Sequence, residues 1–569
     1  MFAKRIRKVI AMLLAVVTAV CCVMCLNGCS EQEETREGYD NLTIYMQAGA
    51  EYVSAEKDPV WEAFQEATKT IIKYMGPSSD YYTALNAMMN DVMDPNRPDI
   101  IFCLPDSTGG AYYKWANEYN FLVDIDELLA QNPGMFPNIE ALFETEAYQS
   151  LEWDGTHYLI PWFTTDNIYS IYYRTDWLIN VGEVDEEGNA KLPETLDDFE
   201  RVLYKFRNDD PDQNGMKDTW GLSPNEESFC WSALYHAFGV CEGWDYDENG
   251  NVVYMGEQEQ MKNFLQWVNK LYELDLIEPQ FNSNSGTKDR EKFKDGTTGI
   301  LLTDAEQHVK WVMTEFESKQ GVGIVQMGAP LKGTGNVSTI TGCVLGVEGA
   351  QGSSTRGSWW GGFSILTSCE NPLAALRYLD YLISEEGSTL NCYGVEGLHY
   401  TVEGQDEEGH AIISISDEQL KNRAAQKRFG TSEMDGVMKF NGRYSIGSNL
   451  QGGVITIQDG KVDVYCQADV IDYHFADLVQ QAADCCVPYY DDIPETLVYP
   501  ESVADAIVSL EEYRERCFNL FILGKYSDIG GSDFESAWNA YISMLGNKKL
   551  DTVKKVVKET AEEFGYTAQ

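Results

Sequence analysis

The sequence predicts an α/β protein that folds into two or more packed lobes. Short apolar runs alternate with amphipathic helical stretches through most of the chain, a pattern typical of sheets covered by helices. The chain has 569 residues, which is enough for more than one lobe, and 44% of them are hydrophobic and can fill the cores.

The first strand is expected at residues 42–46, a short apolar run. Asp58 and Pro59 then mark a helix start, because aspartate caps the first turn and proline has the backbone angle that this turn needs. Apolar residues follow at helical spacing, namely Val60, Trp61, Phe64, Ala67, Ile71 and Ile72. The spacing predicts one helix that continues to Ile72.

Later segments also contain short motifs that mark the starts of strands and helices. Residues 99–104 form a second strand signal that ends in the loop 105–110. Thr195 and Asp198 have the spacing of a capping box, and the predicted buried stripe of that helix is Leu196, Phe199, Val202, Leu203 and Phe206. Asn371 and Pro372 open another helix, with an inward face of Leu373, Leu376, Leu379, Leu382 and Ile383.

Three acidic segments that contain glycine interrupt this pattern, at residues 183–189, 245–251 and 404–410. Asp, Asn and Gly supply the turn geometry of surface hairpins and loops. The glycine-rich stretch 430–460 has no assigned element.

The N-terminus has the pattern of an export signal. A basic head precedes the apolar run 9–24, and Cys29 follows Leu26-Asn27-Gly28. This arrangement resembles the lipobox of bacterial lipoproteins, which implies that residues 1–28 are a signal peptide and that Cys29 is lipidated with palmitate-type chains. The alternative is an uncleaved membrane anchor. Residues 29–40 are acidic and nearly free of apolar side chains, which predicts a flexible tether.

The charge excludes some partners. The formal net charge is −49, and removal of the leader with its four basic residues takes it to −53. So acidic a surface repels nucleic acid and anionic lipid headgroups. We therefore expect no nucleic-acid partner.

The cysteines outside the leader do not predict a metal site. Ten remain after Cys29, and none has C-x-x-C spacing. They are compatible with buried thiols or with disulfides, and the sequence leaves any pairing open.

One short loop has the spacing of a calcium site. Oxygen ligands would come from Asp210, Asp212, Asn214, the Met216 carbonyl and Asp218, and Gly215 allows the sharp turn. Gly221 replaces the bidentate glutamate of an EF-hand. The alternative is an ordinary Asx turn that joins two helices.

Aromatic residues make up 12% of the chain and gather in predicted loops. Indole and phenol faces beside polar side chains suit the C–H faces and hydroxyls of a sugar. Core packing is the alternative for each single tryptophan.

Sequence motifs of catalysis are missing. The chain has 6 histidines and no P-loop, H-E-x-x-H, G-x-S-x-G or dinucleotide fingerprint. We therefore expect no enzyme, although a glycoside hydrolase needs only two carboxyl groups at a spacing that a sequence does not reveal.

Four segments together resemble the extracellular solute-binding proteins of ABC importers, family 1 type. They are the lipobox, residues 159–178, the calcium-like loop with Trp220-Gly221-Leu222, and residues 385–400 with Tyr393-Gly394-Val395-Glu396-Gly397-Leu398-His399-Tyr400. The last segment is similar to large sugar-binding lipoproteins of Gram-positive gut bacteria and to alginate-oligosaccharide binding proteins.

The resemblance implies a type II periplasmic-binding-protein-like fold of two α/β lobes. The N-terminal lobe would comprise residues 41–160 and 367–470, and the C-terminal lobe residues 161–366 and 471–569. Residues 161–173 and 357–366 would be crossings between the lobes. The family implies a monomer that is anchored outside the cytoplasm by its lipid, binds a carbohydrate and delivers it to a membrane permease.

Ligand contacts are assigned by their place near the crossings. Trp162, Trp359 and Trp360 are the first candidates for stacking on a sugar, and the further candidates are Asp106, Tyr112, Asp166, Trp231, Asp304 and Trp311. A lipid-anchored glycoside hydrolase and a peptide-binding receptor of the same fold are the alternative functions.

Overall fold

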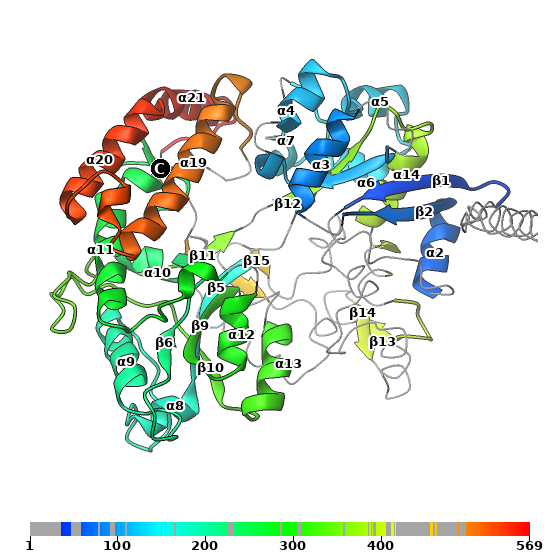
Figure 1. Cartoon of the computed structure of the whole chain (residues 1–569). Coiled ribbons are helices and arrows are strands. Elements are labelled where there is room, and N and C mark those ends of the chain that lie inside the picture. Colours follow the sequence, from blue (N-terminus) through cyan, green and yellow to red (C-terminus); the bar gives the residue numbers. More distant parts are fainter. Residues whose placement is uncertain are drawn as a thin grey trace, which may run out of the picture.

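The structure is a computed structural model of the whole chain (Figure 1). It describes residues 36–46, 59–77, 80–91, 97–108, 111–149, 151–153, 155–163, 167–225, 231–284, 287–304, 309–356, 359–384, 386–387, 390, 394–405, 411–414, 416, 456–458, 461–463, 487–489, 493 and 497–568.

The first sheet belongs to a body that we call the N lobe. Its order is β2-β1-β3-β12-β4. Strand β1 pairs in parallel with β2 and β3, and β12 is antiparallel to both β3 and β4. The strands are β1 (Asp40–Tyr45), β2 (Thr70–Met75), β3 (Ile100–Cys103), β4 (Ile160–Phe163) and β12 (Trp359–Ile365).

Helices cover both faces of this sheet, because successive side chains of a buried strand point to opposite faces. Ile100 and Phe102 of β3 pack on one face with helices α2, α5, α6 and α14, whereas Ile101 and Cys103 pack on the other with α3 and α4. The helices are α2 (Pro59–Thr68), α3 (Tyr81–Asn90), α4 (Ala111–Tyr113), α5 (Ile125–Gln131), α6 (Pro137–Phe143), α7 (Glu146–Gln149) and α14 (Pro372–Ile383).

The second sheet belongs to the C lobe. Its order is β17-β11-β5-β9-β6, and β10 also pairs with β5. Strands β6 and β9 are parallel to each other, and β5 runs antiparallel to β9, β10 and β11. The strands are β5 (Asn167–Arg174), β6 (Trp220–Leu222), β9 (Thr298–Asp304), β10 (Val325–Gly328), β11 (Ser353–Arg356) and β17 (Pro488–Tyr489).

One large apolar cluster joins the C-lobe sheet to helices that come from distant parts of the chain. Figure 1 shows the red and orange C-terminal helices α19 to α21 beside the green α11. The helices are α8 (Thr175–Asn180), α9 (Leu196–Asn208), α10 (Ser232–Tyr235), α11 (Glu259–Glu273), α12 (Lys288–Lys294), α13 (Val309–Gln320), α19 (Glu501–Ile522), α20 (Phe534–Asn547) and α21 (Leu550–Glu563).

Small two-stranded sheets complete the described elements. They pair β7 (Trp244–Tyr246) with β8 (Val252–Tyr254), β13 (Thr401–Gln405) with β14 (Ala411–Ser414), and β15 (Thr456–Gln458) with β16 (Lys461–Asp463).

The helix predicted from Pro59 ends earlier than expected. Helix α2 stops at Thr68, and Ile71 and Ile72 lie in strand β2. Lys69 between them has a left-handed φ of 54°, which ends the helix. The prediction of one continuous helix was wrong, because β-branched residues after the break pair with β1 instead.

Other local predictions are confirmed. Thr195 and Asp198 form a capping box, and the whole predicted stripe of α9 is buried. Asn371 caps α14 with Pro372 in its first turn, although Leu373 is only partly buried. Asp185 and Asp247 organise the turns within 183–189 and 245–251. Residues 406–410 and most of 430–460 lie outside the described residues.

Two further features of the described residues concern membrane-spanning helices and disulfide bonds. In the part of the chain that the structure describes, no helix has the length and apolar character needed to cross a bilayer. Among the described residues, Cys103, Cys241, Cys343, Cys369 and Cys517 are not in disulfide bonds.

Candidate functional site

The two sheets are connected where their parallel strands end. Strand β4 ends at Phe163 and β5 begins at Asn167, while β11 ends at Arg356 and β12 begins at Trp359. Trp359 pairs with Phe163 in the N lobe, and Arg356 pairs with Asn167 in the C lobe. The chain therefore passes between the sheets twice, in opposite directions and side by side.

These passages lie at the carboxyl ends of parallel strands in both lobes. In the N lobe, Gly362 pairs with Cys103, so the start of β12 lies at the carboxyl end of β3. In the C lobe, Tyr169 pairs with Asp304, so the start of β5 lies at the carboxyl end of β9. In open α/β sheets, ligands bind outside the carboxyl ends of the strands. The region between the two sheet ends is the candidate site.

A β-bulge shapes the N-lobe side of the site. The pairing of β12 with β4 shifts between Trp359 and Gly362. Gly361 has a φ of 91°, and a Cβ atom there would lie 2.5 Å from the carbonyl oxygen of Cys103. Only glycine fits this position without strain, since other residues meet both the positive φ and the close backbone.

Most of the predicted ligand residues have backbones at these strand ends. Trp162 is in β4 and Trp359 and Trp360 begin β12, while Asp106 lies in the 3₁₀ turn Pro105–Thr108 that follows β3. Asp304 ends β9 and Trp311 lies in the first turn of α13. The side chains of these six residues, and Asp166 as a whole, lie outside the described part of the structure.

Tyr112 is buried, although a side chain that contacts a sugar directly would be exposed. It is 1% exposed, and its hydroxyl lies 2.7 Å from the Ser364 hydroxyl of β12. Its ring packs between Trp115 and Trp153. Tyr112 therefore belongs to the core beneath the sheet end, where it ties α4 to β12.

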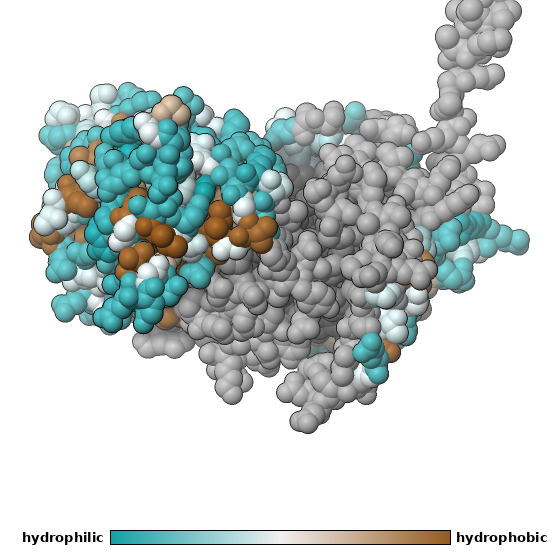
Figure 2. Space-filling model, turned by 90° about the horizontal axis from the view of Figure 1, so that it is seen from below, coloured by the Kyte–Doolittle hydropathy of each residue, from teal (hydrophilic) through white to brown (hydrophobic). Residues whose placement is uncertain are grey.

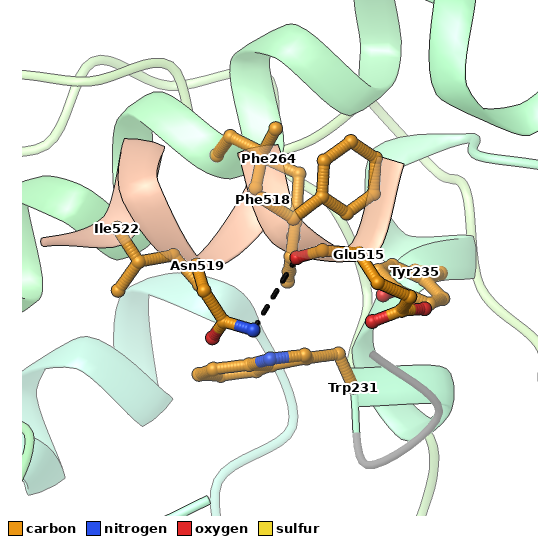
Figure 3. A pocket seen from close by; sticks show the side chains of 8 residues that line it. Trp231, Tyr235, Phe264, Glu515, Phe518, Asn519 and Ile522 are labelled. Carbon is orange, nitrogen blue, oxygen red and sulfur yellow. Dashed lines mark hydrogen bonds between the residues drawn. The ribbon is translucent and has the colours of Figure 1, made fainter. Parts of the chain in front are cut away.

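Trp231 is also buried, with 3% of its surface exposed. It lines a narrow, mainly apolar pocket of the C lobe together with Tyr235, Phe264, Leu265, Glu515, Phe518, Asn519 and Ile522. Figure 3 shows the Asn519 side chain above the indole, and Asn519 donates to the Glu515 carbonyl at 3.3 Å. Helix α19 thus covers the ring, which the sequence could not indicate because α19 lies almost 300 residues later.

A buried polar group that sequence reasoning missed follows the carboxyl end of β6. The amide of Asn284 donates to the Ser223 hydroxyl and to the Pro224 carbonyl, both at 2.8 Å. Ser223 in turn donates to Glu278 at 3.2 Å, and Lys292 forms an ion pair with Glu278. These contacts hold the chain that leaves β6 toward Trp231. The only sequence signal was the polar Ser-Pro-Asn at the strand end.

The calcium-like loop lies at the far end of β6, away from the lobe connections. The Asn214 amide donates to Asp212 at 2.7 Å and to Asp218 at 3.2 Å, while Asp210 accepts from the Gly215 N–H at 3.0 Å. Burial and the nearby carboxylates of Asp218 and Asp210 raise the pKa of Asp212, against a backbone hydrogen bond that lowers it.

The loop backbone is braced from outside. Asn180 donates to the Pro211 carbonyl at 2.7 Å, and Arg207 donates to the carbonyls of Lys217 and Thr219 at 3.0 and 3.2 Å. Among the described residues, no three His, Cys, Asp or Glu side chains are already gathered as metal ligands. The carboxylates fit a hard cation if the Asn214 amide turns its oxygen toward them.

The conspicuous segment 394–400 has a structural role in the described residues. His399 is fully buried and accepts the Val395 N–H at 2.8 Å, and Gly397 donates to the Tyr400 carbonyl at 2.7 Å. Gly394 has a φ of 87° and lies against the imidazole ring. The segment forms a tight turn that lines an N-lobe pocket together with residues of α2 and α14.

Comparison with known proteins identifies the fold and the family. Residues 49–389 match the family model described as bacterial extracellular solute-binding protein. The chain is 24% identical over 407 residues to lipoprotein LipO of Bacillus subtilis, covering 66% of this chain and 71% of that protein. It is 26% identical over 246 residues to the polygalacturonan/rhamnogalacturonan-binding protein YtcQ of the same species, with coverage of 42% and 44%.

Solved structures show the same architecture. The alginate-binding protein AlgQ2 without calcium ion has a TM-score of 0.64 at 16% identity, covering 93% of this chain and 99% of AlgQ2. The ABC-transporter substrate-binding protein FusA of Streptococcus pneumoniae in complex with kestose has a TM-score of 0.62 at 15% identity, with coverage of 92% and 99%. An EF-hand mutant of FusA in complex with fructo-nystose reaches 0.62 at 16% identity, with the same coverage.

The strand orders, the paired lobe connections and these matches agree on a two-lobe, type II α/β binding-protein fold. With more than half of its length matched by the family model, the chain belongs to the family of bacterial extracellular solute-binding proteins.

Proposed function

We propose that this protein is the receptor of an ABC importer and captures an oligosaccharide between its lobes. The observation that carries the proposal is the meeting of strand carboxyl ends from both sheets at the two lobe connections. The names of YtcQ, a polygalacturonan/rhamnogalacturonan-binding protein, and of FusA, a fructooligosaccharide ABC transporter substrate-binding protein, support a carbohydrate ligand.

The proposed contacts divide by chemistry. Trp162, Trp359 and Trp360 stack on the C–H faces of the sugar rings, with Trp311 as a further aromatic surface. Asp106, Asp166 and Asp304 accept hydrogen bonds from hydroxyls, because carboxylates are strong acceptors. Tyr112 and Trp231 support these contacts from the core, where they are buried.

Capture requires movement of the lobes about the connections. The expected boundaries at 160/161 and 366/367 shift, because β4 and β12 belong to the N-lobe sheet. We assign residues 41–163 and 359–470 to one lobe and residues 167–356 and 471–569 to the other. A ligand that touches both lobes binds the closed form more tightly and shifts the population toward it. The closed form then reports occupancy to the permease, and the sugar is released unchanged.

The proposed receptor is a monomer held outside the cytoplasm. Cys29 carries the lipid, and residues 29–40 connect it to β1. The name of LipO as a lipoprotein supports this anchor. A lipid anchor keeps the receptor beside its permease, which raises the effective concentration for docking.

We further propose a structural calcium ion in the loop 210–218. Asp210, Asp212, Asn214, the Met216 carbonyl and Asp218 would hold it, far from the sugar. The cation would neutralise three carboxylates that otherwise repel one another. The calcium ion named for AlgQ2 and the EF-hand named for FusA support this assignment.

The test is binding to a panel of fructan, pectin and alginate oligosaccharides, measured by calorimetry and by the shift in melting temperature. The Trp359→Ala and Trp360→Ala double variant should bind the best of these sugars with a loss of about 2–4 kcal/mol. Binding of peptides in place of sugars would indicate a peptide receptor. New reducing ends after incubation with an oligosaccharide would indicate a hydrolase. If the double variant binds the sugar with unchanged affinity, the sugar does not stack on these two residues.

A further inference from the structure

One loop of the C lobe presents apolar side chains to solvent. Residues 333–347, which we call the valine loop, contain Val337, Val344 and Val347, which are 66%, 47% and 46% exposed. Seen from below, brown hydrophobic side chains form patches on the described surface of this lobe (Figure 2). Apolar side chains gathered at one surface mark a contact site for another molecule.

The valine loop is ordered by its own hydrogen bonds. Val337 bridges to Val344 across the loop, and the Leu345 N–H donates to the Asn336 carbonyl at 2.8 Å. Gly346 has a φ of 70°, and the Ala237 carbonyl lies where its Cβ atom would be. The ordered backbone of the loop therefore holds the valines at the surface, and their exposure is not caused by local disorder.

A buried carboxylate fastens the loop to the lobe. Glu200 of α9 is 2% exposed and accepts hydrogen bonds from Trp267 Nε1 at 3.1 Å and Thr341 Oγ1 at 2.6 Å. It also accepts from the hydroxyl of Ser338. Several donors offset the desolvation of this carboxylate, and two of them come from the valine loop. The loop is thus held against α9 and α11 as a rigid projection.

The composition of the loop indicates what it contacts. Residues 333–347 include no Asp, Glu, Lys, Arg, Trp, Tyr or Phe, within a chain whose net charge is −53 without its leader. A second copy and an anionic lipid surface would both be repelled by that charge. The loop also lacks the aromatic and basic residues that hold a protein at a membrane interface. An uncharged apolar protein surface is the chemistry that fits.

We propose that the valine loop docks on the extracytoplasmic surface of the importer's permease, where apolar residues receive the three valines. The inference rests on the proposed receptor function. Three valines make a small contact, and small contacts suit complexes that form and separate repeatedly. Such turnover is what delivery of successive sugars requires.

The first test compares Val337→Ser, Val344→Ser and Val347→Ser, combined in one full-length lipoprotein, with a matched control. The control is Val322→Ser, which changes a 65% exposed valine in the turn after α13. Cells that carry each receptor are given a labelled oligosaccharide of the fructan, pectin and alginate panel. We expect at least a tenfold loss of uptake with the triple variant and none with the control, while sugar affinity and melting temperature stay unchanged in both.

Full uptake by a triple variant that still binds sugar would overturn the docking role. A wild-type protein that binds no sugar of the panel would instead count against the proposed function. A second test then still reports on the loop, because it needs no sugar.

In that test a photoreactive benzoylphenylalanine replaces Val337 or, as the control, Val322 in intact cells. We expect position 337 alone to cross-link to a multispanning permease subunit identified by mass spectrometry. Cross-links to a second receptor, to lipid or to a cell-wall protein, or equal products from both positions, would overturn the proposal.

Discussion

His236 and Glu242 are buried side by side in the C lobe, at 3% exposure each, with 3.9 Å between Nε2 and Oε1. Burial lowers the pKa of His236 below its usual value of 6.5, although the Glu242 charge opposes this effect. The imidazole is therefore neutral in the folded protein near neutral pH.

This burial predicts a dependence of stability on pH. Below pH 6.5 the unfolded chain binds a proton at His236 that the folded protein binds only at lower pH. The stability present above pH 6.5 is thus lost as the pH falls toward the folded pKa, by at most about 1.4 kcal/mol per pH unit for this group. Urea unfolding at pH 7.5, 6.5 and 5.5 measures the slope.

His236→Gln should flatten the slope in this range relative to wild type, whatever its effect at neutral pH. The comparison matters because many carboxylates of so acidic a chain also titrate as the pH falls. Identical slopes for the two proteins would show that His236 does not contribute.

At the scale of single elements, β12 combines a strand with a bulge at the lobe connection. Gly361→Ala adds a Cβ atom 2.5 Å from the Cys103 carbonyl at a positive φ. We expect a loss of about 2–4 kcal/mol in the free energy of unfolding, from overpacking and backbone strain together. Denaturant unfolding checks this value.

Gly546 in α20 provides the matched control, since its added Cβ atom would meet nothing within 4 Å. Gly546→Ala should leave stability unchanged or raise it by up to about 1 kcal/mol, because alanine favours the helix. A Gly361→Ala protein as stable as this control would mean that the bulge tolerates a side chain.

The loop 210–218 is a second element with a measurable property. Calcium should raise the melting temperature of the wild-type protein, and a chelator should lower it, because a cation that binds only the folded loop stabilises it. Asp210→Asn with Asp218→Asn should abolish this response. Asp247→Asn, in the exposed β7–β8 turn, should retain it. A calcium response that survives the double substitution would place the ion elsewhere.

For the whole molecule, the two connections predict a change of shape on binding. A sugar that bridges the lobes should reduce the radius of gyration in X-ray scattering, since closure brings two bodies together. The Trp359→Ala and Trp360→Ala double variant should keep the larger radius at the sugar concentration that closes wild type. A radius that does not change with saturating sugar would contradict closure.

Much of the architecture could be predicted from local signals. The capping box at Thr195, the Pro372 helix start and the turn at Asp247 depend on atoms a few residues apart, so the sequence displays them. The break after Thr68 was missed because the apolar spacing continued through it. Pairing with β1, not spacing, assigns Ile71 and Ile72 to a strand.

By itself, the sequence determined the alternation of strands and helices, the acidic surface and the candidate loop for a cation. Only the tertiary structure decided which aromatic residues near the strand ends are core. Tyr112 meets Ser364 across 252 residues of chain, and Trp231 is covered by Asn519 of a far later helix. Burial is set by such distant partners, and no window of sequence contains both members of the pair.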